Sequence, residues 1–119
     1  MRFIFVILAL LLTIHASSGL NIIQKPDIFA NQGSSVILHC EQDNADYYRM
    51  SWYRQTSDNH TLELLAFSMV QGSQSIEPPF DKADKYIMTR PEVLKGTLQI
   101  EKLEAADSAL YYCATSLTQ

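Results

Sequence analysis

The two cysteines of the chain, Cys40 and Cys113, constrain its fold more than any other feature. No other cysteine is present, and the two lie 73 residues apart, so a bond between them would close most of the chain into one loop. In an oxidising compartment such a crosslink stabilises a domain by about 4 kcal/mol through the entropy of the unfolded chain. The alternative is a metal site made of both cysteines with His39 and His60. Its spacing argues against it, because there is no Cys-x-x-Cys or His-x-x-x-His pair, and because His39 would lie on the opposite strand face from Cys40.

The first nineteen residues predict a secretory signal peptide, which supplies that oxidising compartment. Arg2 precedes an apolar run from Phe3 to Leu12, and the small residues Ala16 to Gly19 follow. A membrane anchor is the rival, but a spanning helix needs about 20 apolar residues. We therefore expect residues 1–19 to be removed and residues 20–119 to form one domain. That domain carries eight basic and thirteen acidic residues, a charge of -5 without a basic stripe, so nucleic acid is not an expected partner.

The rest of the sequence alternates apolar and polar residues in short runs, which is the pattern of half-buried strands. The run "SSVILHC" is typical, with Val36, Leu38 and Cys40 on one face. Strands are expected at residues 34–40, 49–55, 62–67, 85–89, 96–103 and 108–115. A polar turn is expected at 56–61, and a short corner of about one helical turn at 104–107. Turns every 8 to 12 residues predict an all-β sandwich or barrel.

Trp52 lies 12 residues after Cys40 and 61 before Cys113, and Tyr111 lies two residues before the second cysteine. This order is the framework of immunoglobulin domains, in which an indole packs on a disulfide between two sheets and a tyrosine hydroxyl bonds the backbone upstream. Here that acceptor is expected between Leu103 and Ala105.

The chain resembles the immunoglobulin V-set, and most closely the variable segment of a T-cell receptor beta chain. The resemblance rests on "IIQKP", "GSSVILHC", "SWYRQ", "LELLA", "DKYIMTRPEVLKGTLQIEKL" and "DSALYYCAT". It implies a V-type sandwich of two antiparallel sheets. Germline-encoded V-set receptors, adhesion domains and immunoglobulin light chains share the skeleton and stay open as alternatives.

In this family the strand that contains Tyr111 pairs with a strand from a separate joining segment that carries Phe-Gly-x-Gly. This chain has only "ATSLTQ" after Cys113, so that strand is expected to be missing. We expect the edge left open to make the isolated segment marginally stable or prone to aggregation. The resemblance also implies that Asp107 pairs with a basic residue. Lys85 is the expected partner and Arg90 the competitor.

Three loops are expected at one end of the sandwich. Tyr47 in the first loop is an amphipathic residue suited to ligand contact, whereas Tyr48 is expected to edge the core. The candidate ligand-binding residues are Asp43, Asn44, Asp46 and Tyr47 in the first loop, Met69, Val70 and Gln71 in the second, and Thr115 and Ser116 in the third. By resemblance, these loops would meet a peptide held by a major-histocompatibility molecule.

A second surface is expected on the outward face of the central strands. Its members are Tyr53, Gln55, Leu62, Leu64 and Tyr112. An apolar face of this kind predicts a partner, and the resemblance names an alpha-type variable domain, with Gln55 bonding a matching glutamine.

Other features bear on processing and chemistry. The sequon "NHT" makes Asn59 a candidate glycosylation site. No cofactor or metal is expected, and no catalytic constellation accompanies the two histidines left after processing. We expect a non-catalytic receptor segment on the extracellular face of the plasma membrane, with anchor and signalling supplied by other segments and chains.

Overall fold

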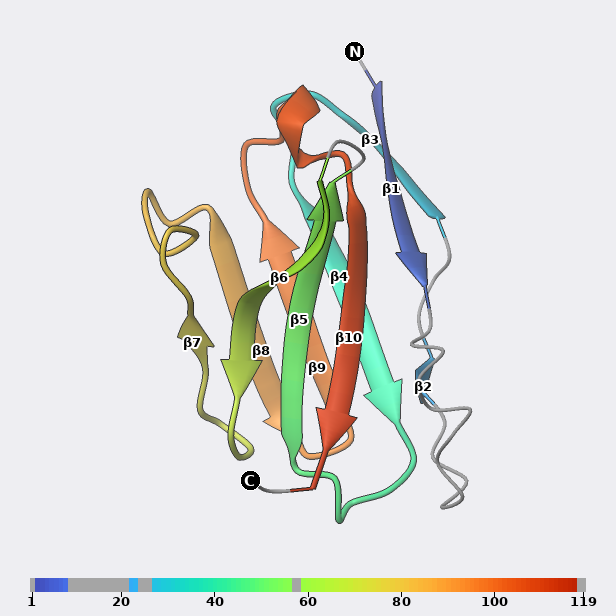
Figure 1. Ribbon diagram of the computed structural model, residues 1–119, viewed down its shortest axis with the longest axis vertical. Helices are drawn as coiled ribbons and strands as arrows, with labels where there is room; N and C mark the ends of the chain where they lie inside the picture. The colour runs from blue at the N-terminus through green and yellow to red at the C-terminus, as the bar shows by residue number, and fades with distance from the viewer. Residues whose placement is uncertain (1, 9–21, 24–26, 57–58, 118–119) are drawn as a thin grey trace.

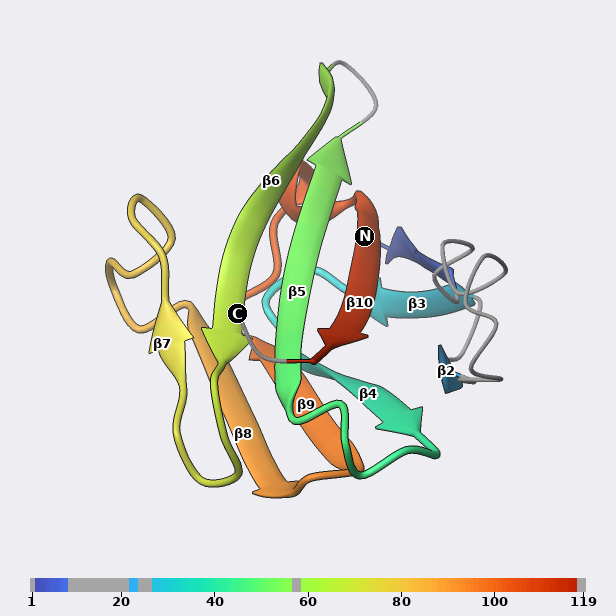
Figure 2. The same cartoon turned by 60° about the horizontal axis from the view of Figure 1, so that its bottom comes forward.

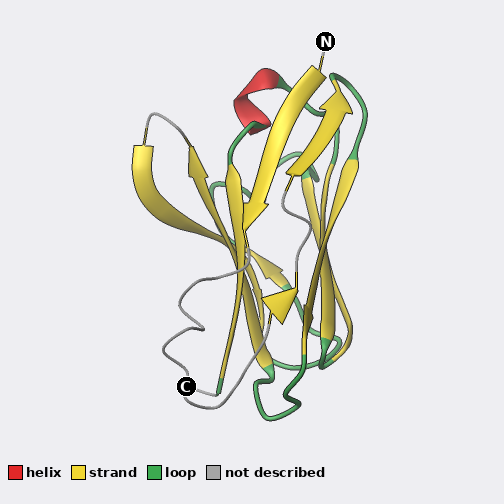
Figure 3. Ribbon diagram, turned by 90° about the vertical axis from the view of Figure 1, so that its right-hand side faces the viewer, coloured by secondary structure: helices red, strands yellow, loops and turns green. Residues whose placement is uncertain are grey.

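Buried residues alternate with exposed ones along strand β4 (Val36–Gln42), as the sequence pattern predicts. The computed structural model describes residues 2–8, 22–23, 27–56 and 59–117. Within them the chain folds into two β-sheets that face one another (Figures 1 and 3). The all-β, V-type fold expected from the sequence is confirmed.

The larger sheet has six strands and the smaller has four. The order in the larger sheet is β3 (Asp27–Asn31), β1 (Arg2–Leu8), β10 (Leu110–Ser116), β5 (Arg49–Thr56), β6 (Asn59–Ser68) and β7 (Ser75–Ile76). The order in the smaller sheet is β2 (Ile22–Ile23), β4, β9 (Lys95–Ile100) and β8 (Tyr86–Glu92). Strands β4 and β10, which carry the two cysteines, therefore lie in different sheets.

The core lies between the sheets and is centred on the disulfide. Cys40 and Cys113 are bonded, with Cα atoms 6.3 Å apart, which uses both sulfurs and leaves no thiolate for a metal. Trp52, which pairs with Cys113 across β5 and β10, is fully buried. Leu38, Leu98, Ile100 and Leu103 are among the other buried residues of this core, so Trp52 and Leu103 lie in the interior where the sequence placed them.

Several boundaries differ from the sequence expectation. Strand β6 begins at Asn59, inside the stretch expected to be a turn, because its pairing with β5 continues past a bulge to the pair Thr56–Asn59. The short strands β3 and β7 were not foreseen, since neither has a clear two-residue period. The motif residues Gln24 and Pro26, the tip of the turn at 57–58 and the expected leader cleavage site fall outside the described residues.

Strand β1 belongs to the segment predicted as a signal peptide. In the full chain it lies between β3 and β10, antiparallel to β3 and parallel to β10. Its pairs with β10 run from Val6–Leu110 to Leu8–Tyr112. The edge of β10 that was expected to be open is therefore partly paired in this structure, because β1 supplies backbone groups there. Removal of the signal peptide, residues 1–19, stays a prediction. The exposure of the β10 edge, which depends on that removal, stays one too.

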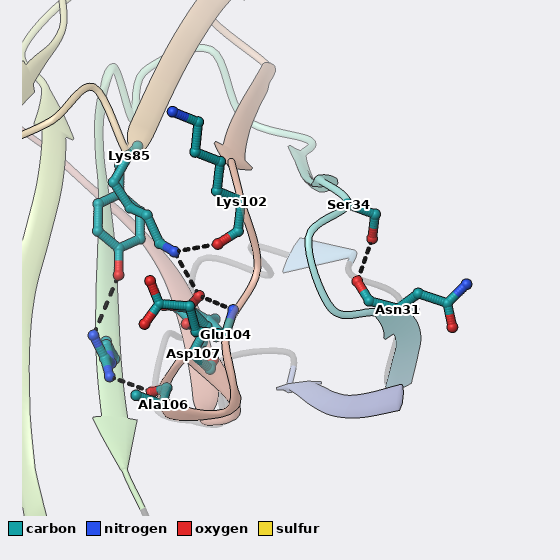
Figure 4. A network of polar contacts seen from close by, with 10 residues as sticks. Asn31, Ser34, Lys85, Lys102, Glu104, Ala106 and Asp107 are labelled. Carbon is teal, nitrogen blue, oxygen red and sulfur yellow. Dashed lines mark hydrogen bonds and ion pairs between the residues drawn. The ribbon is translucent and has the colours of Figure 1, made fainter. Parts of the chain in front are cut away.

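The corner before β10 is a short 3-10 turn, Ala105–Asp107, as the sequence suggested. Figure 4 shows the polar contacts around it. The Asp107 carboxylate is almost buried, accepts the backbone N–H of Glu104 at 2.8 Å and lies 2.7 Å from Lys85 Nζ. Lys85 also donates to the carbonyl oxygen of Lys102 at 2.8 Å. Arg90, the competing partner, lies elsewhere in the core.

The tyrosine corner differs in its acceptor. The Tyr111 hydroxyl donates to the carbonyl oxygen of Asp107 at 2.6 Å, so the expected acceptor between Leu103 and Ala105 was wrong. The 3-10 turn is the reason, because it ends at Asp107 and places that carbonyl beside the ring. Burial raises the pKa of the Tyr111 hydroxyl, which is the protonated donor in this contact.

Candidate functional site

One end of the sandwich gathers the loops that the sequence marked for ligand contact. The loop between β4 and β5, the loop between β6 and β7, the turn between β8 and β9 and the end of β10 all lie there (Figures 1 and 2). The corner at Ala105–Asp107 lies at the opposite end. Hereafter loop one is residues 43–48, loop two is residues 69–74 and the hub turn is residues 91–94.

In loop one, polar side chains shape the backbone as well as face solvent. The Asn44 side chain accepts the backbone N–H of Asp46 at 2.9 Å, and the Asn44 carbonyl accepts the N–H of Tyr47 at 3.0 Å. Asp46 is exposed. The tyrosines reverse the expectation, since Tyr47 is half-buried and Tyr48 is 38% exposed. The alternation of buried and exposed side chains along a strand does not continue through a turn. It therefore could not predict which of the two tyrosines is exposed.

Loop two exposes two neighbouring apolar side chains at this end. Met69 is 44% exposed and Val70 is 49% exposed. The backbone reverses at Gly72, whose φ of +84° is strained for residues with a side chain. The hydroxyls of Ser68 and Ser73 both donate to the Val70 carbonyl oxygen, at 2.7 Å and 3.0 Å. These bonds hold the two apolar side chains outward on an ordered turn.

The third loop begins at the end of β10. Thr115 pairs with Met50 and Ser116 pairs with Arg49 across the two strands. Thr115 is half-buried and its hydroxyl has no partner among the described residues, while Ser116 is exposed. The neighbouring Arg49 was missed in the sequence. Its guanidinium lies 5.9 Å from the Phe67 ring centroid. Arg49 therefore places a cation where loop one ends, opposite Ser116 of the third loop.

The expected partner-facing surface is assembled on the outer side of the larger sheet. Tyr112 pairs with Tyr53, and Tyr53 pairs with Leu64, so the three form a row across β10, β5 and β6. The Tyr112 hydroxyl donates to Gln55 Oε1 at 3.4 Å. Leu62, two residues before Leu64, is 47% exposed and the other four are half-buried. We call these five residues the outer face.

Asn59, the sequon residue, is the first residue of β6. Thr61, two positions later, is exposed. The sequon thus begins at the first residue of a strand, and its glycan occupancy stays a prediction.

A second arginine that the sequence analysis did not foresee lies at the far end of β5. Arg54 donates from Nη2 to the Ala106 carbonyl at 2.7 Å and from Nη1 to the Tyr86 hydroxyl at 3.2 Å, and it stacks 5.8 Å from the Phe80 ring centroid. Burial raises the pKa of Tyr86, and the nearby Arg54 charge opposes that rise. These contacts are structural and lie away from the loops.

Comparison with known proteins agrees with this geometry. The family description "immunoglobulin V-set domain" matches residues 23–119. T cell receptor beta variable 7-4 of Homo sapiens is 34% identical over 115 residues, covering 94% of this chain and 93% of that protein. T-cell receptor beta chain V region C5 of Mus musculus is 36% identical over 86 residues, covering 72% of this chain and 66% of that protein.

A solved structure supports the same assignment. It is described as the structural basis of T cell specificity and activation by the bacterial superantigen toxic shock syndrome toxin-1. One of its chains matches with a TM-score of 0.73 and 26% identity, over 85% of each chain. The chain thus belongs to the immunoglobulin V-set family, and within that family its sequence groups with the variable segments of T-cell receptor beta chains.

In the part of the chain that the structure describes, we find no helix with the length and apolar character needed to cross a membrane.

Proposed function

We propose that the chain is the antigen-recognition segment of a beta-type receptor chain, which binds a peptide–major-histocompatibility complex together with an alpha-type variable domain. The observation that carries the proposal is the outer face. Tyrosines, leucines and one glutamine lie together across three strands there, and a monomer gains nothing from exposing them. A relative of the alpha type, T cell receptor alpha variable 1-1 of Homo sapiens, is 25% identical over 82% of this chain, which is compatible with pairing between two similar domains.

The loop end supports the ligand half of the proposal. Tyr48, Met69 and Val70 are exposed on turns that hydrogen bonds hold in place. Aromatic and long apolar side chains on ordered loops bind a protein surface at low entropic cost. The proposed role is binding without catalysis. We propose a location on the outer surface of the plasma membrane, with signalling by associated chains.

Co-secretion with an alpha-type chain tests the partner. The chain, extended by a joining strand and constant domain, is expected to form a heterodimer. Leu62→Glu should abolish or greatly reduce assembly by placing a charge in an apolar contact. Ile87→Glu is the matched control, because Ile87 is 43% exposed but lies on β8 in the other sheet. The proposed interface would be contradicted if both variants formed the heterodimer as well as the wild type does.

Sequencing lymphocyte transcripts tests the receptor class. We expect many different junctions after the Cys113 codon, each followed by Phe-Gly-x-Gly and a beta-type constant domain. A single fixed continuation would indicate a germline-encoded receptor instead, and a light-chain constant domain would indicate an antibody segment.

A further inference from the structure

Arg90 is a buried cation whose hydrogen bonds all end on backbone carbonyls. Its side chain is 1% exposed, and the described residues contain no carboxylate within ion-pair distance of it. The guanidinium donates from Nε to the carbonyls of Glu92 and Val93 at 3.1 Å and 3.2 Å, and from Nη2 to Val93 at 2.7 Å. Burial of an arginine without a counter-ion is costly. The planar guanidinium of Arg90 offsets this cost by donating several hydrogen bonds at once to the Glu92 and Val93 carbonyls, a geometry that lysine does not provide.

The hub turn that Arg90 holds is also bonded to loop two. The backbone N–H of Gly72 donates to the carbonyl of Arg90 at 2.9 Å, and the Gln71 side chain donates to that of Pro91 at 2.9 Å. Arg90 Nη1 also lies 3.5 Å from the carbonyl oxygen of Ser68, where loop two begins. Loop two is therefore bonded to the hub turn directly through Gln71 and to the adjacent Arg90 through the Gly72 amide. Arg90 also contacts Ser68, the residue just before loop two.

Loop one reaches the same turn through Gln42, which is 5% exposed. Its side-chain amide donates to the Tyr47 carbonyl at 2.6 Å and to the Val93 carbonyl at 3.2 Å. Its backbone N–H donates to the Leu94 carbonyl at 2.9 Å. The Val93 carbonyl thus accepts from both Gln42 and Arg90. Loop one is linked through Gln42 and this oxygen atom to Arg90, whose own carbonyl accepts the Gly72 amide of loop two.

We propose that Arg90 and Gln42 are positioning residues that fix loop one and loop two to the hub turn, so that the two ligand-binding loops behave as one unit. The inference rests on the proposed function for its biological meaning. A change at the base of one loop is transmitted to the other through the Val93 carbonyl. Substitutions in loop one then alter recognition by loop two without touching it.

Native-state hydrogen exchange on the disulfide-bonded full chain tests this coupling, with the receptor heterodimer measured in parallel. Gln42→Met removes a contact of loop one. It is expected to speed exchange of the Gly72 amide in loop two at least tenfold. Arg90→Lys keeps the charge but loses the fork, and it should speed exchange of both the Tyr47 and the Gly72 amides. The amides of Gly33 and Leu103, at the opposite end, should change less than twofold.

Lys85→Met is the matched control because it weakens the fold at the opposite end. It should speed amide exchange near Leu103. At Gly72 it should cause no increase in exchange beyond that expected from the loss of global stability. The inference is overturned if Gln42→Met affects loop one alone, or if every amide speeds up by one common factor. Arg90→Met can be added if that variant folds. Gln42→Met and Arg90→Lys decide the result without it. Because no ligand is used, failure of the proposed antigen binding would leave the exchange result intact.

Discussion

Replacement of Lys85 by methionine isolates the value of the ion pair with Asp107. The variant keeps the length and apolar stem of the side chain but leaves the Asp107 carboxylate, whose side chain is 7% exposed, with one remaining donor, the N–H of Glu104. Removing one partner of a fully buried pair costs about 3–5 kcal/mol. The Lys85 side chain is 19% exposed and the Glu104 contact persists, so we expect the free energy of unfolding to fall by about 2 kcal/mol.

The assay is urea unfolding followed by Trp52 fluorescence, with Lys82→Met as the control. Lys82 is exposed and three residues away, so the same change of charge and shape there should cost below about 0.5 kcal/mol. In an Asp107→Asn background, Lys85→Met should cost about 1–2 kcal/mol less than in the wild type, since no carboxylate is left unpaired. Equal losses for the Lys85 and Lys82 variants would refute the reasoning.

Two further predictions concern the core. Gly96→Ala should lower the free energy of unfolding by about 1–3 kcal/mol, because a Cβ there would overlap Met50 Sδ and approach the Thr89 carbonyl oxygen at 3.2 Å. Thermal unfolding should show that Met50→Ala relieves part of this loss, and full additivity of the two changes would contradict the overlap. Burial raises the pKa of Tyr111 above its value in the unfolded chain. The contribution of Tyr111 to the free energy of unfolding should therefore be fully present below about pH 10 and be lost as the pH rises further. Ultraviolet titration should show Tyr111 ionising only as the protein unfolds, and ionisation in the native state near pH 10 would contradict this.

Much of the fold was predictable because its signals are local or depend on residue type alone. The period of two from Val36 to Cys40 fixes which side chains are buried, and the Cys40–Trp52–Cys113 spacing fits a single arrangement of two sheets. The pairing of Lys85 with Asp107 followed from family resemblance, and the two side chains lie 2.7 Å apart. The outer face followed from the alternation of the central strands, and its residues lie together across β10, β5 and β6. Strand β7 and the extension of β6 to Asn59 depend on pairing with neighbours, for which two or three residues carry no readable pattern.

The candidate site was predictable in its location and less so in its details. The loops could be placed because they follow recognisable strands, but Tyr47 and Tyr48 were assigned the wrong way round, since alternation ends where the strand ends. Arg90 was considered only as a partner for Asp107. Its role was invisible because all its acceptors are backbone carbonyls, which every residue carries and no sequence pattern marks.

By itself, the sequence determined the class of the fold, the disulfide and the end of the sandwich that carries the loops, because spacing and periodicity are properties of the chain. Only the tertiary structure decided which carbonyl Tyr111 bonds, which loop tyrosine faces solvent and how Gln42 and Arg90 meet at the Val93 carbonyl. Those outcomes depend on distances between segments up to about fifty residues apart. Such distances are fixed when the two sheets pack, and not before.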